Sequence, residues 1–288
     1  MTSTKIKTRK TADERRAEAD QLHDSITGQL EELTSSEGWA RFLATATGFH
    51  RYSLSNVLLI QSQRPDATRV AGFRQWQSRG RQVRKGERSI KIFGYSTKRI
   101  EPDENSDSDE EERRTFYPIL SVFDISQTDP IDGVDEVPDF APRLKGGDDA
   151  GIYDATAAWL TEQGWTVTRE TLPQEDGSTS IDGTRAVRIH DELSPAHAAV
   201  TILHEAGHAL MHSELTDYHQ HRGIYETEAE SVAYITAGVL GLDTSANSIG
   251  YIAGWTRGDV ETVKATAARV LTTVRTILDG ITEADDPR

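Results

Sequence analysis

The stretch from His204 to His208, which reads His-Glu-Ala-Gly-His, restricts the fold and the chemistry of this chain more than any other. In a helix, residues four apart lie on one face and one turn from each other, so His204 and His208 could hold one Zn²⁺ between them. Glu205 would lie beside the metal and act as the general base that takes a proton from the attacking water. The stretch therefore predicts a zinc-dependent hydrolase site that is carried on a helix.

A third protein ligand is needed for a catalytic zinc. The metzincin spacing would place a histidine at position 214, where this chain has a glutamate. Glu226 and Glu230 lie four residues apart on one expected helix face, so Glu226 is the predicted ligand, and Glu230 would accept a hydrogen bond from the outer N–H of a ligating histidine. Glu228 is turned by about 200° from Glu226 on an α-helix. The alternative is that these acids form an ordinary solvated helix start, and the choice among positions 226, 228 and 230 stays open.

The expected helix begins at Ser194, because a serine followed by proline is a typical helix start, and it should end near His212. His212 shares the face of the two predicted ligands but lies one turn further along. It is expected either to support a ligand from behind or to lie at the surface.

The chain contains no cysteine, so disulfides and thiolate ligands are excluded, and a zinc ion must be held by histidine and carboxylate groups. No apolar run approaches the roughly 20 residues that span a bilayer, and no apolar segment follows the basic N-terminus. We therefore expect a cytoplasmic protein without a membrane partner. The length of 288 residues favours two domains.

Charge is distributed unevenly along the chain. The formal net charge is −15, yet residues 41–99 hold 13 Lys and Arg against 2 Asp and Glu. Basic side chains can follow a phosphate backbone, and interleaved aromatic side chains can stack on unpaired bases. The alternative is a solvated basic face over an aromatic core. Since no motif that reads duplex DNA is present, we expect single-stranded DNA as the partner, contacted by Arg51, Arg74, Trp76, Arg79, Arg81, Arg84, Lys85, Arg88 and Lys91.

The hydrophobic pattern predicts an α+β protein of two parts. Residues 1–20 are expected to be a basic flexible tail that runs into a helix, because apolar residues recur every three or four positions from Thr11 to about Thr34. Residues 21–128 are expected to form a small α+β DNA-binding domain with an acidic disordered insert at 101–114. Residues 129–150 are expected to be a linker, and 151–288 a mainly helical domain. In the second part, the pattern predicts two strands at 165–170 and 186–189 around a loop at 174–184, and helices at 152–163, 194–212, 226–240, 245–255 and 259–278.

Several stretches resemble those of a known family. Asn56–Leu59, Phe73–Gln75, Gln82–Glu87 and Val122–Gln127 resemble the N-terminal domain of ArdC-type antirestriction proteins. The C-terminal half, with His204–His212, Glu226–Glu230 and Ser248–Trp255, resembles their zincin-like metallopeptidase domain and, more broadly, the ImmA/IrrE-type zinc peptidases.

The resemblance implies a protein of a plasmid, phage or other mobile element that binds single-stranded DNA and protects incoming DNA from restriction. It also implies His204, His208 and Glu226 as zinc ligands, with Glu205 catalytic. Two alternatives remain open. One is a peptidase that cleaves or sequesters a host restriction or regulatory protein, and the other is a DNA-binding protein whose zinc domain is a non-catalytic scaffold. The acidic insert is not part of the resemblance.

Overall fold

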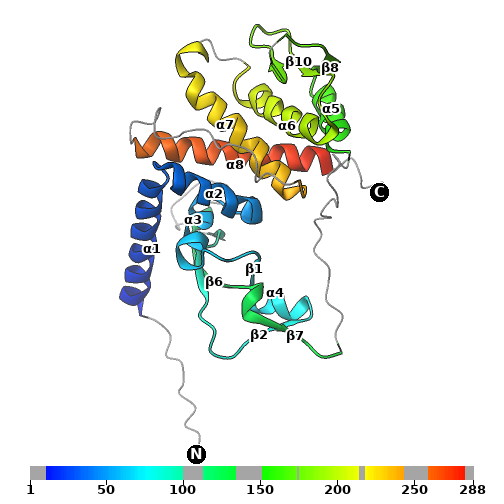
Figure 1. Cartoon of the computed structure of the whole chain (residues 1–288). Coiled ribbons are helices and arrows are strands. Elements are labelled where there is room, and N and C mark those ends of the chain that lie inside the picture. The colour runs from blue at the N-terminus through cyan, green and yellow to red at the C-terminus, as the bar shows by residue number, and fades with distance from the viewer. Residues whose placement is uncertain are drawn as a thin grey trace, which may run out of the picture. The chain divides into compact units, whose positions relative to one another are not determined.

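The computed structural model describes residues 11–99, 113–133, 151–173, 175–213, 218–242 and 259–282, which form helices and small sheets in an α+β fold (Figure 1). The chain divides into two compact units. One comprises Met1–Gln29 and Leu58–Asp135, and the other comprises Leu30–Val57 and Glu136–Arg288. None of the helices in the described ranges has both the length and the apolar character that crossing a membrane requires.

The first unit is built from short strands. Its strands are β1 (Val70–Gly72), β2 (Arg81–Val83), β3 (Ile90–Phe93), β4 (Ser96–Arg99), β5 (Arg113–Phe116), β6 (Ile119–Asp124) and β7 (Thr128–Pro130). They form an antiparallel sheet of order β1-β6-β3 and two pairs, β2-β7 and β4-β5. Ile90 and Ile92 are buried while Lys91 between them is half-buried, so alternate residues of β3 face the core, as the period of a strand requires.

Three helices belong wholly or partly to this unit: α1 (Ala12–Glu32), α3 (Leu54–Gln63) and α4 (Phe73–Ser78). Behind α4, Ala71, Trp76 and Val83 form a buried cluster with Phe123 and Ile125 against it. The Trp76 indole is 2% exposed and donates a hydrogen bond to the backbone oxygen of Phe123 at 2.8 Å. Trp76 is therefore a core residue, and the prediction that it stacks on a DNA base is wrong for this structure.

Three predicted boundaries are corrected by the structure. Residues 12–20 belong to α1, which agrees with the helix predicted from Thr11 to about Thr34 and shortens the predicted tail; the apolar face of α1 includes the buried Leu22. Arg113 and Arg114, expected in the disordered insert, belong to β5 and pair with β4. Asp129 and Pro130, expected in the linker, belong to β7 and pair with β2. The rest of the insert (101–112), of the tail (1–10) and of the linker (134–150) lies outside the described residues.

Asp124 ties the end of β6 to the neighbouring loop. Its buried carboxylate accepts backbone N–H bonds from Thr68 at 2.8 Å, Arg69 at 2.9 Å and Ser126 at 2.8 Å. Burial raises the pKa of this carboxyl group, but the hydrogen bonds lower it further, so the pKa of Asp124 lies below its ordinary value. The charged form is thus the one that stabilises the fold.

We expect Asp124→Asn to lower the stability of the first unit by roughly 2–3 kcal/mol, because charge-assisted hydrogen bonds to a buried group are removed. Since the folded-state pKa is depressed, this contribution is present above the unfolded pKa of about 4 and is lost as the pH falls through the folded pKa. Hydrogen exchange of peptides covering β1 and β6 measures the effect. Asp66→Asn, at an exposed carboxylate in the same unit, is the matched control. Equal effects of the two variants at neutral pH would contradict this role of Asp124.

The second unit contains a small mixed sheet and five helices among the described residues. Its elements are α2 (Ser36–Phe49), α5 (Ile152–Glu162), β8 (Thr166–Glu170), β9 (Gly177–Thr179), β10 (Ala186–His190), α6 (Pro195–Met211), α7 (Tyr218–Val239) and α8 (Val260–Thr282). β10 lies between β8, which is parallel to it, and β9, which is antiparallel. Helices α6, α7 and α8 pack on one another (Figure 1). Strand β9 lies within the stretch predicted as a loop, and the helix predicted at 245–255 lies outside the described residues.

Helix α2 belongs to this second unit, although its residues were expected in the N-terminal domain. Its buried residues Trp39, Phe42, Leu43 and Ala46 recur every three or four positions, so they form one apolar face. The Trp39 indole donates to the Ser231 hydroxyl of α7 at 3.1 Å. The linker predicted at 129–150 therefore does not separate the two compact units. The apolar face of α2 packs on α7, so a helix that precedes the predicted linker belongs to the second unit.

Candidate metal centre

Helix α6 positions both histidines of the His-Glu-Ala-Gly-His stretch. The Ser194 hydroxyl accepts the N–H of His197 at 3.4 Å, and Pro195 occupies the first turn, as expected for a helix start. Ile202, Leu203 and Ala206 are fully buried and fix the rotation of the helix.

Gly207 lets α7 approach α6 closely. A Cβ atom at position 207 would lie 3.1 Å from Cα and 3.4 Å from Cβ of Ala229. Such a short separation is rare for side chains, so a larger residue would push the helices apart. The glycine within the motif thus brings the Glu226 turn of α7 over the two histidines.

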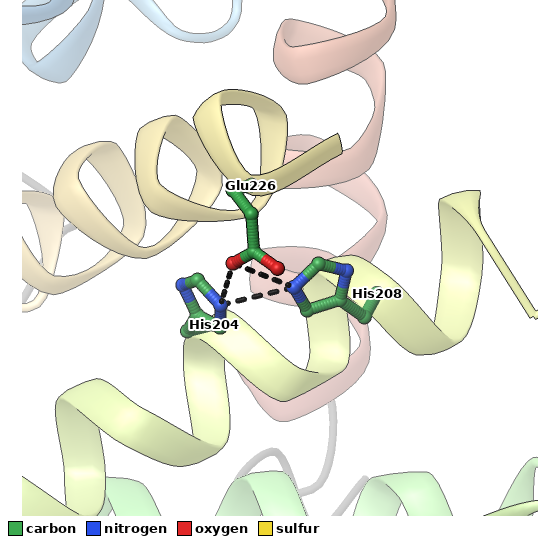
Figure 2. A group of neighbouring side chains, drawn as sticks. All are labelled: His204, His208 and Glu226. Carbon is green, nitrogen blue, oxygen red and sulfur yellow. Dashed lines mark hydrogen bonds and ion pairs between the residues drawn. The ribbon is translucent and has the colours of Figure 1, made fainter. Parts of the chain in front are cut away.

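His204, His208 and Glu226 meet at one point (Figure 2). The Nε2 atoms of the two histidines are 3.0 Å apart, and Oε2 of Glu226 lies 3.5 Å from one and 3.6 Å from the other. Tetrahedral ligands about 2.1 Å from a metal are separated by about 3.4 Å. Both the donor types and their spacing therefore fit a divalent metal ion.

Behind His208 runs a chain of buried hydrogen bonds. His208 Nδ1 lies 2.9 Å from Nδ1 of His212, and His212 Nε2 lies 2.9 Å from Oε2 of Glu228. A carboxylate can only accept, so His212 carries its proton on Nε2 and accepts through Nδ1. His208 then donates from Nδ1 and presents the lone pair of Nε2 to the metal position. The chain of hydrogen bonds fixes the tautomer that a ligand needs.

Glu228 anchors this chain of hydrogen bonds. Its side chain and that of His212 are both 0% exposed. The other carboxylate oxygen of Glu228 accepts a hydrogen bond from the guanidinium of Arg269 on α8. A buried carboxylate is costly unless it is paired, and here a half-exposed arginine on one side and an imidazole on the other satisfy it.

The histidine pKa values respond to burial and to nearby acids. For His208, burial has the largest effect and lowers the pKa, although Glu226 raises it in part. For His204, burial also lowers the pKa, but Glu226, Glu205 and Glu230 raise it more, so the pKa ends above its ordinary value. His208 is thus held in the neutral form that binds metals.

Glu205 lies between α6 and the edge strand β9. Its carboxylate is buried, and burial raises its pKa above the ordinary value. The Thr179 hydroxyl lies 2.7 Å from Oε2 of Glu205, and a Cβ at Gly177 would lie only 2.7 Å from Oε1. Strand β9 therefore holds the Glu205 side chain in place. A carboxyl group whose pKa is raised towards neutrality is suited to accept and release a proton.

The structure brings together His204, His208 and Glu226, and it buries His212 directly behind His208. Glu228 does not join the three, in keeping with its angle on the helix, but it is a buried partner of His212 and not a solvated acid. Glu230 is close enough to raise the pKa of His204. The carboxylate that supports His208, through His212, is that of Glu228. From its angle on the helix, Glu228 was expected to point away from the site.

Sequence reasoning missed Thr179 and Arg269. Thr179 lies in a stretch predicted as a loop, and its three-residue strand is too short to leave a clear alternation. Arg269 lies far along the chain on α8, and the exposed face of an amphipathic helix normally carries such a cation. No local sequence pattern marks either residue as part of the site.

The residues predicted to contact DNA have different environments. Arg74, Arg79, Lys85 and Arg88 are exposed on the first unit. Lys91 donates to the Ser121 hydroxyl at 2.7 Å. Others are used within the fold: Arg81 donates to the Thr128 hydroxyl at 2.7 Å, and Arg84 pairs with Glu87 at 3.1 Å and Asp129 at 3.2 Å.

Arg51 differs from the rest because it belongs to the second unit. It pairs there with Asp279 of α8 at 2.8 Å. The cationic surface of the first unit is therefore smaller than the count of basic residues suggested.

Each half of the chain matches a family model of known proteins. A family model described as the N-terminal domain of anti-restriction factor ArdC matches residues 16–123, and one described as an IrrE N-terminal-like domain, of the peptidase M78 group, matches residues 160–242. The fold and the domain order thus define a protein that joins an ArdC N-terminal domain to an IrrE-like domain.

Solved structures share this fold. The metal-free crystal structure of the antirestriction protein ArdC from plasmid R388 covers 82% of this chain and 87% of its own, with a TM-score of 0.52 and 21% identity. The Mn(II)-bound structure of that protein covers 82% and 86%, with a TM-score of 0.51 and 20% identity. The chain therefore shares the fold of these ArdC structures and matches the ArdC N-terminal domain model over its first part.

A curated relative extends beyond this domain pair. An uncharacterised protein of Bacillus anthracis is 26% identical across 98% of this chain, which corresponds to 54% of the relative. The chain thus spans about half the length of that relative.

Proposed function

We propose that this chain is an antirestriction-type protein of a mobile element, which binds single-stranded DNA and carries a zinc-dependent, metallopeptidase-like site. The observation that carries the proposal is the combination of an ArdC N-terminal domain with the His204, His208 and Glu226 group in one chain. A protein that meets single-stranded DNA as it enters a cell acts in the cytoplasm.

Support for the DNA partner comes from charge and from the N-terminal match. Residues 41–99 hold 13 Lys and Arg against 2 Asp and Glu, and the cations exposed on the first unit include Arg69, Arg74, Arg79, Arg84, Lys85 and Arg88. Neutralising phosphates releases counterions, so such a surface attracts a polyanion in a salt-dependent way. The matching family takes its name from an antirestriction factor, in keeping with a role in protecting DNA.

Support for zinc comes from the donor set. Two histidine nitrogens and one carboxylate oxygen are the three protein ligands of many zinc hydrolases, which keep a fourth position open. When bound, the ion supplies Lewis acidity to a substrate carbonyl and lowers the pKa of a water molecule. The Mn(II)-bound structure of ArdC from R388 indicates that a protein of this fold takes a divalent metal.

The residues of the chain supply the proton transfer. Glu205, with its raised pKa, takes the proton of the attacking water and later releases it to the leaving amine. The Thr179 hydroxyl holds Oε2 of Glu205, which keeps the carboxylate in one orientation during both steps. His208 stays in its ligand tautomer because His212 and Glu228 hold it from behind.

Glu205→Gln separates catalysis from DNA binding. We expect the variant to bind metal and single-stranded DNA as the parent does, but to lose protection when unmodified DNA is transferred into a restricting host, because the amide cannot accept the proton. The measurement is the transfer efficiency into restricting and non-restricting isogenic hosts, together with the metal content and a DNA titration. Full protection by the Gln variant would mean that the metal domain serves as a scaffold.

A second candidate function is favoured by the IrrE-like match over residues 160–242. In that case the site would cleave or sequester a regulatory protein or a restriction protein of the host. Protein profiling of hosts that express the parent or Glu205→Gln would reveal a cleaved partner as a fragment that appears only with the parent.

A further inference from the structure

Two strand pairs of the first unit form one interrupted ribbon. Phe93, the last residue of β3, pairs with Ile119, the first of β6, and Ser96, the first residue of β4, pairs with Phe116, the last of β5. Between them, the N–H of Gly94 donates to the backbone oxygen of Pro118 at 2.7 Å. Residues 94–95 and 117–118 therefore lie opposite each other at the interruption.

Two tyrosines project from this interruption. Tyr95 is 72% exposed and Tyr117 is 66% exposed, and their ring centroids lie 6.2 Å apart at an interplanar angle of 65°. Phe116 and Leu120 beside them are also exposed. Large apolar side chains that gather at an exposed point are typical of binding sites. Because the two rings are tilted, they offer faces in different directions and could each take one base.

Cations continue along the same ribbon. The register of β4 and β5 pairs Lys98 with Arg114 and Arg99 with Arg113. Residues 101–112, between β4 and β5 in the sequence, hold eight acids and no base, which weakens attraction by charge alone. Base stacking must then supply a larger share of the affinity.

We propose that Tyr95 and Tyr117 form a stacking platform for unpaired bases of single-stranded DNA. Bases in a duplex are already stacked, so their faces become available only in a single strand. The sequence predicted that Trp76 would contact the bases, but Trp76 is buried. We therefore assign the aromatic contact to Tyr95 and Tyr117 instead. This inference rests on the proposed DNA-binding function.

The test uses the full chain and two fluorescently labelled oligonucleotides of equal length, one of deoxythymidine and one with abasic sites throughout. Tyr95→Ala with Tyr117→Ala is expected to weaken binding of the first by roughly 10-fold or more, because stacking on each base is worth about 1–3 kcal/mol. Binding of the abasic strand should not change. Tyr95→Phe with Tyr117→Phe keeps both rings and should bind as the parent does.

Salt dependence distinguishes base stacking from charge neutralisation. The alanine variant should keep the slope of log Kd against log salt, because it removes no positive charge. Far-UV circular dichroism and the thermal midpoint show that each variant is folded.

The outcomes separate this inference from the function on which it rests. If the alanine variant binds the deoxythymidine strand as tightly as the parent does, the platform is ruled out, but DNA binding is not. Equal weakening on the abasic strand would also overturn it, because base stacking could not then explain the weakening. A parent chain that binds neither oligonucleotide would overturn the proposed function as well.

Discussion

Glu226→Gln is expected to lower the affinity of the full chain for Zn²⁺ by more than about 100-fold. Oε2 of Glu226 lies 3.5 Å and 3.6 Å from the two histidine Nε2 atoms, so it completes the group that surrounds the metal position. Loss of an outer partner of a ligand typically costs about 10–100-fold in metal affinity, and loss of a ligand should cost more. The neutral amide also removes the negative charge that offsets the cation.

Glu230→Gln is the matched control, because it removes the same charge one turn further along α7. We expect it to lower the affinity by less than about 10-fold, since it acts on His204 through its charge. Competition with a chromophoric chelator measures both variants. Saturating Zn²⁺ at 100 times Kd should also stabilise the parent by about 2.7 kcal/mol, and this gain should be absent in the Glu226 variant. The reverse ranking of the two variants would identify Glu230 as the ligand.

The local part of the site could be predicted because it follows helix geometry. His204 and His208 are one turn apart on one helix, and Glu226 is placed by the periodicity of a second helix, so spacing alone brings each side chain to the right face. How the two helices meet depends on Gly207, where an added Cβ would lie 3.1 Å from Cα of Ala229. That approach is a tertiary contact, which spacing within a single helix does not reveal.

The supporting part of the site could not be predicted from spacing. Glu228 lies on the far side of the helix from the metal position, and an acid at such a place is usually solvated. Its burial follows from α8, where Arg269 pairs with it, and from the buried His212 next to α6. Three helices must be placed before this arrangement exists, so no pattern within one segment reveals it.

Trp76 illustrates a different limit. Aromatic residues among cations can either stack on bases or fill a core, and composition does not separate the two. The structure decides between them by burying Trp76 behind α4 and exposing Tyr95 and Tyr117 at the interrupted ribbon. Helix α2 shows the same limit at the level of domains, because an apolar face predicts burial but does not say against which partner.

Glu228→Ala is expected to lower the free energy of unfolding of the second unit by about 3–5 kcal/mol, even without metal. Removing one member of a buried set of paired polar groups leaves the remaining groups without their hydrogen-bond partners. His212, which is 0% exposed, would lose the acceptor of its Nε2 proton, and the Arg269 guanidinium would lose the carboxylate to which it donates. Without Glu228, the tautomer of His208 is less firmly fixed, so the Zn²⁺ affinity should also fall by about 10–100-fold.

Unfolding of the metal-free protein in EDTA, followed by hydrogen exchange of peptides from α6, α7 and α8, measures the stability effect, and chelator competition measures the metal effect. Glu170→Ala is the matched control, because Glu170 pairs with Arg188 at 3.4 Å where both side chains are about half exposed. Such a surface pair should contribute less than about 1 kcal/mol. Glu228→Gln keeps an acceptor for His212 and should fall between the parent and the alanine variant. If Glu228→Ala is no more destabilising than Glu170→Ala, the buried chain of hydrogen bonds behind His208 does not hold the site together.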